Sequence, residues 1–170
     1  IQVLFTSKYI LGFDANGEFY VFKLTSGSGH WTLLSTTTDS VPAVNLSSML
    51  SVTILPTVYY SLMNCSGELV FKSLYPFVFS LVPVVLFTIY SKRFGKAAAF
   101  LASMFFVFSS WAFYGAEPLS LNRQIIGVFF LALSILVILD KKLSLGNRRI
   151  LLFVFGAALV FSHYSLLLIY

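Results

Sequence analysis

Residues 73–90 read SLYPFVFSLVPVVLFTIY, a run of 18 residues without a charged side chain. Similar apolar runs follow at 97–116, 124–139 and 150–170. A transmembrane helix needs roughly 20 predominantly apolar residues, so these runs predict four membrane spans. Of the 170 residues, 58% are hydrophobic and 10% are charged, whereas about 25% of the residues in an ordinary soluble domain are charged. We therefore predict an all-α, polytopic membrane protein.

The positive charges are concentrated in two short segments between apolar runs. The chain has 11 Lys and Arg residues and a net charge of +5, and seven of these residues lie within 92–96 and 141–149. Basic turns between spans are typical of the cytoplasmic side of a membrane protein, whereas a nucleic-acid-binding protein carries a basic stripe on one face. We therefore expect no nucleic-acid partner. With both turns inside, the segments 14–72 and 117–123 lie on the non-cytoplasmic side.

The first 72 residues are more polar than the rest. Residues 1–13 are apolar and are interpreted as the end of an earlier span, which suggests a fragment cut from a longer protein. Residues 14–72 are predicted to form an external loop, with a short helix around 15–24. Altogether, 1–170 is expected to be a single transmembrane domain fragment.

Residues 46–63, LSSMLSVTILPTVYYSLM, allow two interpretations. Their length suits a fifth span, but Ser, Thr and Tyr side chains are frequent and Pro56 interrupts the run. An apolar residue recurs at every fourth position, which gives one apolar stripe, as a helix lying on the membrane surface requires. The stripe consists of Leu46, Leu50, Ile54, Val58 and Leu62. We favour an interfacial helix over 46–63.

Two carboxylates follow the apolar start, in the stretch GFDANGEFY. Asp14 and Glu18 are four residues apart, which places both on one face of a helix. A carboxylate next to apolar surface and a second charge binds a proton more tightly, and this suits a general base that accepts a proton from a hydroxyl. The alternative is that both are solvated charges at the start of a helix.

A second group of polar residues occurs in EPLSLNRQ, between the second and third runs. An arginine at the start of a span usually has a partner, so Arg123 is expected to form an ion pair with Glu117 or to bind a phosphate group bidentately at the membrane surface. Gln124 is adjacent to Arg123 and is a further candidate for phosphate binding.

Two histidines complete the candidates. His163, in VFSHYS, lies within the last predicted span, where an ionisable side chain is often functional; a hydrogen bond to a neighbouring helix is the alternative. His30 lies in the polar loop and is a minor candidate. The spacing of these residues predicts no metal site, and the one cysteine, Cys65, excludes an internal disulfide.

The stretches that carry a resemblance to a known family are GFDANGEFY, NLSSMLSVTILPTVYYSL, FYGAEPLSLNRQIIGVFF and FSHYS. The chain resembles the N-terminal half of the membrane-embedded glycosyltransferases of the GT-C superfamily. It is most similar to an archaeal family of multi-pass membrane proteins of unassigned function. The resemblance implies a GT-C-like bundle fragment in the cell membrane. It also implies a hexosyltransferase that moves a sugar from a polyprenyl-phosphate or dolichyl-phosphate carrier to an unknown protein, lipid or glycan acceptor at the outer face.

The resemblance also implies roles for individual residues. Asp14 matches the acidic residue that the superfamily carries in its first external loop and is implicated in catalysis, with Glu18 as its companion. Arg123 would bind the departing lipid phosphate. The DxxxE spacing departs from a tight acidic pair, so participation of a divalent cation is left open. A multi-pass transporter, with ionisable groups along a path near the midplane, and a non-enzymatic membrane scaffold are the alternative functions.

Overall fold

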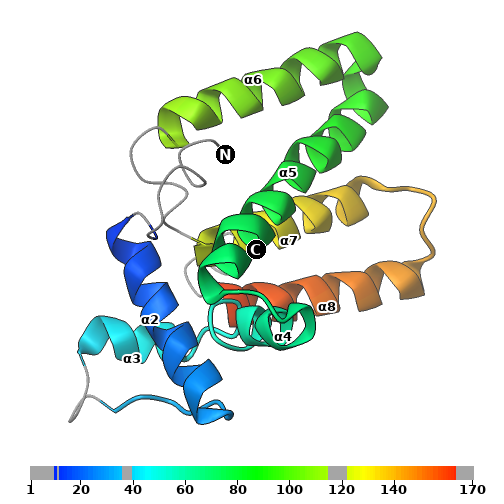
Figure 1. Ribbon diagram of the computed structural model, residues 1–170. Helices are drawn as coiled ribbons and strands as arrows, with labels where there is room; N and C mark the ends of the chain where they lie inside the picture. Colours follow the sequence, from blue (N-terminus) through cyan, green and yellow to red (C-terminus); the bar gives the residue numbers. More distant parts are fainter. Residues whose placement is uncertain (1–9, 11, 36–39, 115–121, 164–170) are drawn as a thin grey trace.

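The computed structural model describes residues 10, 12–35, 40–114 and 122–163 of the chain (Figure 1). Within these residues the protein is all-helical and contains no strand, which confirms the all-α part of the predicted fold class. The helices are α2 (Phe13–Ser28), α3 (Val41–Ser47), α4 (Ile54–Met63), α5 (Gly67–Phe94), α6 (Lys96–Tyr114), α7 (Asn122–Leu139) and α8 (Leu145–Ser162).

Three of the described helices, α5, α7 and α8, are long and apolar enough to cross a membrane. Their 28, 18 and 18 residues correspond to about 42, 27 and 27 Å of helix, compared with a hydrocarbon core of about 30 Å. The expected span at 97–116 corresponds to α6. Its stretch Lys96–Ser109 is apolar but shorter than the three candidate spans. These helices indicate a membrane protein.

Helix α5 lies between α6 and α7, and α7 also packs against α8 (Figure 1). Val82, Val85 and Ile89 of α5 form a buried apolar cluster with Ala132 of α7. Short turns join α5 to α6 and α7 to α8, so both turns come to the same end of the helices.

An ion pair fixes the two basic turns to each other. Lys92 Nζ donates to Asp140 Oδ2 at 2.7 Å, and Arg148 Nη2 donates to the carbonyl oxygen of Asp140 at 2.7 Å. The structure therefore confirms that 92–96 and 141–149 lie at one end. The side of the membrane on which they lie stays a prediction.

Helices α2, α3 and α4 lie at the opposite end of α5 and α7 (Figure 1). Phe22 of α2 is buried with Phe71 and Tyr75 of α5 and with Ile125 and Ile126 of α7. The helix expected around 15–24 is thus present as α2. Gly12 before the helix (φ 106°) and Gly29 after it (φ 70°) both have a positive φ, which glycine adopts without steric cost.

The single helix expected over 46–63 is wrong, because α3 ends at Ser47 and α4 starts at Ile54, with turns between them. Pro56 lies in the first turn of α4. It has no amide hydrogen, which costs least in the first turn of a helix and so favours a helix start here. The exposed side chains of Ile54, Val58 and Leu62 retain the apolar stripe on α4. Its ten residues span about 15 Å, too short to cross a membrane.

Two other boundaries differ from the expected ones. Helix α5 begins at Gly67 rather than at residue 73, because the hydroxyl of Ser66 caps it by accepting a hydrogen bond from the Leu69 amide at 3.3 Å. The predicted external loop 14–72 therefore contains α2, α3, α4 and the first turns of α5. The predicted end of a span at 1–13 lies almost entirely outside the described residues.

Helix α8 ends at Ser162 rather than continuing to residue 170. The amide of Leu50 donates to the carbonyl oxygen of Phe161 at 3.0 Å. The hydroxyl of Ser51 donates to the carbonyl oxygen of Ser162 at 3.2 Å. Donors from a distant turn thus satisfy carbonyls at the end of the helix. His163 follows with an extended backbone, and residues 164–170 lie outside the described part.

Close packing at Gly67 gives a test of how α2 docks on α5. A Cβ atom added at Gly67 would lie 2.6 Å from Cε1 of the buried Phe22 ring. We expect Gly67→Ala to destabilise the protein by about 1–3 kcal/mol through overpacking. The readout is the thermal unfolding midpoint in detergent.

Gly146→Ala is the matched control, since it also lies in the first turn of a helix but has no atom within 4 Å of the added Cβ. It should stabilise the protein by roughly 0.5–1 kcal/mol. Equal midpoints for the two variants would contradict the packing of α2 on α5.

Candidate functional site

The start of α7 and one face of α2 together form a cluster of charged and polar side chains, called here the Glu18 cluster: Asp14, Glu18, Asn122 and Arg123. Arg123 Nη2 donates to Asp14 Oδ2 at 3.1 Å. Arg123 Nε lies 3.7 Å from Glu18 Oε1, which is an ion-pair distance rather than a hydrogen bond. Both carboxylates therefore face Arg123, as their spacing of four residues on one helix predicts.

Glu18 is fully buried, and its carboxylate accepts hydrogen bonds from the beginning of α7. Its Oε2 accepts from the backbone amide of Asn122 at 3.0 Å and from the side-chain amide of Asn122 at 2.8 Å. A longer contact of 3.5 Å joins Oε1 to the amide of Arg123. The first amides of a helix have no partner within that helix and carry partial positive charge, so Glu18 caps α7 from another helix.

Burial changes how readily Glu18 ionises. Desolvation raises the pKa of Glu18 from 4.5 to about 7, against the opposing effects of the Asn122 hydrogen bonds and the Arg123 charge. The carboxyl group therefore gains or loses its proton near neutral pH. When Glu18 gains or loses this proton, the net charge next to Arg123 changes by one unit.

Asp14 differs from Glu18 in its access to solvent. Its side chain is 38% exposed, that of Arg123 is 20% exposed and that of Glu18 is 0% exposed. A bound molecule could thus reach the Asp14 carboxylate and part of the Arg123 guanidinium, but not Glu18. A carboxylate can accept a proton from a hydroxyl, and a guanidinium can bind phosphate oxygens.

His163 lies at the same end of the molecule. Its backbone amide donates to the carbonyl of Leu159 at 2.8 Å and completes α8. Burial, and to a smaller extent the positive charge of Arg123, lowers the pKa of His163. The structure therefore brings together Asp14, Glu18 and Arg123, three of the predicted site residues.

The other predicted residues have different positions. Gln124 follows Arg123 on α7 and is half-buried, but adjacent helix residues do not share a face. His30 lies beyond the end of α2, where it is exposed and its Nδ1 contacts the carbonyl of Ser28 at 2.9 Å. From Glu18 to Ser28 the helix rises about 15 Å, so His30, beyond that end, does not join the cluster. Glu117 lies outside the described residues, and its pairing with Arg123 stays a prediction.

Asn122 is a member of the cluster that sequence reasoning missed. Its side chain is buried, at 4% exposure, and its two hydrogen bonds to Glu18 join α2 to α7. The one sequence signal is its place immediately before Arg123, where the polar segment EPLSLNRQ meets an apolar run. Asparagine is favoured near helix starts, but nothing local indicates a partner 104 residues earlier.

The part of the chain that the structure describes contains no group of three or more His, Cys, Asp or Glu side chains that could hold a metal ion. Participation of a divalent cation stays an expectation that comes from the family resemblance. The Glu18 cluster has an arginine at its centre, so it brings its own cation to the two carboxylates.

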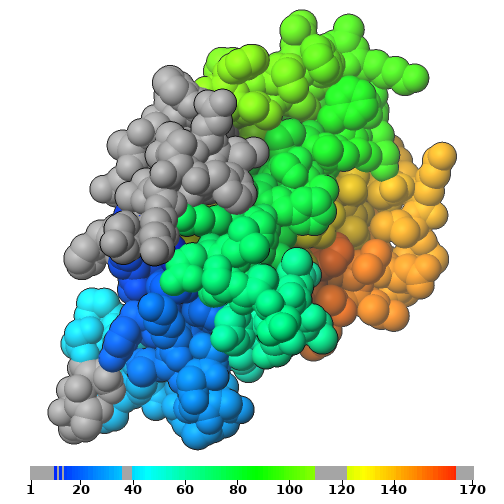
Figure 2. Space-filling model, viewed as in Figure 1, coloured from blue at the N-terminus to red at the C-terminus, as the bar shows by residue number. Residues whose placement is uncertain are grey.

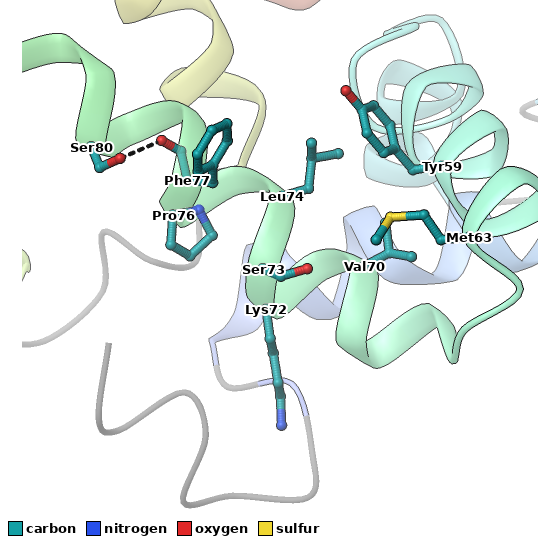
Figure 3. Close-up of a pocket in the computed structure, with 9 residues that line it drawn as sticks. All are labelled: Tyr59, Met63, Val70, Lys72, Ser73, Leu74, Pro76, Phe77 and Ser80. Atoms are coloured by element: carbon teal, nitrogen blue, oxygen red, sulfur yellow. Dashed lines mark hydrogen bonds between the residues drawn. The ribbon is translucent and has the colours of Figure 1, made fainter.

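An apolar groove of about 480 Å³ lies between α4 and α5, apart from the Glu18 cluster (Figure 3). Tyr59 and Met63 of α4 face Val70 and Leu74 of α5 across it. Farther along α5, Ser80 donates to the carbonyl of Phe77 at 2.6 Å and so directs its hydroxyl to the backbone. The groove is lined by Tyr59, Met63, Val70, Lys72, Ser73, Leu74, Pro76, Phe77 and Ser80. Its walls suit a hydrocarbon chain better than a sugar.

The raised pKa of Glu18 predicts how stability varies with pH. The folded protein binds the proton more tightly than the unfolded chain, so protonated Glu18 contributes fully below pH 4.5 and this contribution declines as the pH rises to about 7. A pKa difference of this size corresponds to about 3 kcal/mol. Glu18→Gln cannot titrate, so the unfolding free energy of the wild type should decline relative to that of the variant over this window.

The measurement is the unfolding midpoint of both proteins in detergent from pH 4 to pH 8. Parallel profiles for the wild type and Glu18→Gln would show that Glu18 ionises in the folded protein as it does in the unfolded chain, and would contradict its burial.

The candidate function rests on the geometry of the Glu18 cluster and on the resemblance seen in the sequence. No protein-family model, no curated protein and no solved structure matches the chain.

Proposed function

We propose that the chain is the N-terminal part of a GT-C glycosyltransferase that moves a sugar from a polyprenyl-phosphate carrier to an acceptor on the non-cytoplasmic side. The observation that carries the proposal is the partly exposed Asp14 carboxylate, paired with Arg123 at 3.1 Å. This pair lies at the start of the candidate span α7, at the end opposite the basic turns. With α6 as a fourth span, the helices form a GT-C-like bundle fragment.

The chemistry of such a transfer needs a base and a cation close together. The acceptor hydroxyl oxygen attacks the anomeric carbon, and its proton passes to the Asp14 carboxylate. The bond between the anomeric carbon and the phosphate oxygen breaks, and the lipid phosphate leaves with the electron pair. Arg123 is placed to stabilise the charge that develops on this phosphate. The anomeric configuration inverts, since attack and departure occur on opposite faces of the sugar.

Glu18 then has a positioning role. Its carboxylate is buried and does not reach a substrate, but it holds the first amides of α7 and lies next to Arg123. The direction of the Arg123 side chain depends on this anchor. Protonation of Glu18 leaves Asp14 as the single negative partner of Arg123 within the cluster.

The location of the cluster supports a lipid-linked donor. The phosphate of a polyprenyl carrier lies at the membrane surface, where a span such as α7 begins. The groove between α4 and α5 lies along the half of α5 nearer this end, and its apolar walls suit a hydrocarbon chain. A carrier with its phosphate at Arg123 would have its sugar on the side of the exposed Asp14.

A non-enzymatic membrane scaffold is the second candidate, and one observation favours it. The contacts of Glu18 and the pairing of Asp14 with Arg123 are internal contacts that would also serve simply to fasten α2 to α7. The two functions differ in what removal of the Asp14 charge does. In a scaffold it changes stability alone, whereas in a transferase it also abolishes sugar transfer.

Asp14→Asn keeps the size of the side chain and removes its basicity. In membranes that contain the intact protein, with labelled polyprenyl-phosphate mannose or glucose as donor, we expect sugar transfer to fall at least about 100-fold, as for loss of a general base. Glu68→Gln, in the first turn of α5, removes a carboxylate outside the cluster and should transfer sugar like the wild type.

Unchanged transfer by Asp14→Asn would exclude this residue as the base. Absence of transfer by the wild type with every polyprenyl-phosphate sugar supplied, with Asp14→Asn altering stability alone, would favour the scaffold.

A further inference from the structure

The end of the molecule opposite the Glu18 cluster carries a dense group of positive charges, called here the basic end. Both of its turns lie at the right of the molecule in Figures 1 and 2, one between α5 and α6 and the other between α7 and α8. Asp140 is the acidic residue at these two turns. The cations are Lys92, Arg93, Lys96, Lys141, Lys142, Arg148 and Arg149.

Two of these cations already serve the fold. Lys92 pairs with Asp140 Oδ2 at 2.7 Å, and its hydrogen bond holds the pKa of Asp140 below the usual value. Arg148 donates to the carbonyl of Asp140 and is half-buried. Five cations are exposed beyond these contacts, so the basic end has a large excess of accessible positive charge.

The position of Lys96 is unfavourable for its own helix. Lys96 is the first residue of α6. The N-terminal end of a helix carries partial positive charge, so a cation there is destabilising. Helix stability therefore does not account for this side chain, whereas an external anion at the basic end would.

Apolar side chains flank the exposed cations. Phe94, Leu145 and Ile150 are 70%, 61% and 63% exposed, and all three lie at the ends of helices that also contain the candidate spans α5 and α8. Exposed apolar side chains beside cations match the boundary of a bilayer, where hydrocarbon and headgroup phosphates adjoin. A free phosphate ion or an acidic protein surface would leave these apolar side chains in water.

We propose that the basic end binds the headgroups of anionic phospholipids, chiefly through Arg93, Lys96, Lys141, Lys142 and Arg149. Lysine and arginine side chains near a membrane surface attract anionic lipids, each by roughly fivefold in affinity, and the attraction weakens as salt rises. The contact between Lys92 and Asp140 joins the two turns, so their cations form one surface. This role is independent of sugar transfer at the other end of the spans.

The test measures lipid selectivity of the intact protein in vesicles of phosphatidylcholine with a minor share of phosphatidylglycerol. Spin-labelled forms of both lipids report their relative association constants at the protein surface. The wild type should prefer phosphatidylglycerol, and high salt should reduce the preference. Lys96→Gln should lower it by roughly fivefold, and a combined Arg93→Gln, Lys96→Gln, Lys141→Gln, Lys142→Gln and Arg149→Gln variant should abolish it.

Lys23→Gln is the matched control, because Lys23 is an exposed lysine on α2, away from the basic end. It should keep the wild-type preference for phosphatidylglycerol. The thermal midpoint of each variant in phosphatidylcholine alone separates loss of lipid binding from loss of fold.

Four outcomes would overturn the proposal. Three of them are equal association of both lipids with the wild type, retained selectivity in the folded five-charge variant, and the same loss in Lys23→Gln as in Lys96→Gln. Sodium phosphate should displace phosphatidylglycerol no better than sodium chloride of the same ionic strength. Specific displacement by phosphate would identify a discrete phosphate site instead of a lipid surface.

Discussion

The buried carboxylate of Glu18 is the contact on which the arrangement of this protein depends. Helix α2 lies outside the candidate spans, yet Glu18 fastens it to the first amides of α7 through Asn122. Desolvation of a carboxylate is costly, and here the first amides of α7 and the guanidinium of Arg123 offset part of that cost. The same contact fixes which face of α2 lies inward and therefore where Asp14 lies. Fold and candidate site consequently share one anchor.

Much of the fold could be predicted because a helix that crosses the hydrocarbon core of a membrane needs a long apolar run, which is visible in the sequence. The runs at 73–90 and 124–139 fall within helices, and α6 covers the described part, 97–114, of the run at 97–116. The boundaries were harder, since tertiary contacts set several of them. Donors from Leu50 and Ser51 end α8 at Ser162, although the apolar sequence continues. The single helix over 46–63 was predicted from its periodicity, which outweighed the effect of Pro56 on the backbone.

The site could be predicted in part for a similar reason. Spacing alone placed Asp14 and Glu18 on one helix face, and the position of Arg123 before an apolar run indicated a partner. The identity of that partner was not predictable, because the pair joins residues 109 positions apart in the chain. Asn122 was missed since its two hydrogen bonds acquire meaning only once Glu18 is buried beside it. Local patterns thus identify charged candidates better than the neutral residues that hold them.

The turn between α3 and α4 has a consequence for how sequences of this architecture can vary. The carbonyl oxygen of Ser51 accepts a hydrogen bond from the Tyr75 hydroxyl at 2.8 Å. The Ser51 hydroxyl and the Leu50 amide donate to carbonyl oxygens at the end of α8. The Leu50 amide and the Ser51 carbonyl belong to the backbone, and any residue except proline supplies both. Substitution of Leu50 is therefore less restricted than insertion or deletion in this turn, whereas the fully buried Val52 and Thr53 are also restricted in side chain. Related chains are expected to keep the length of this turn constant even where its residues differ.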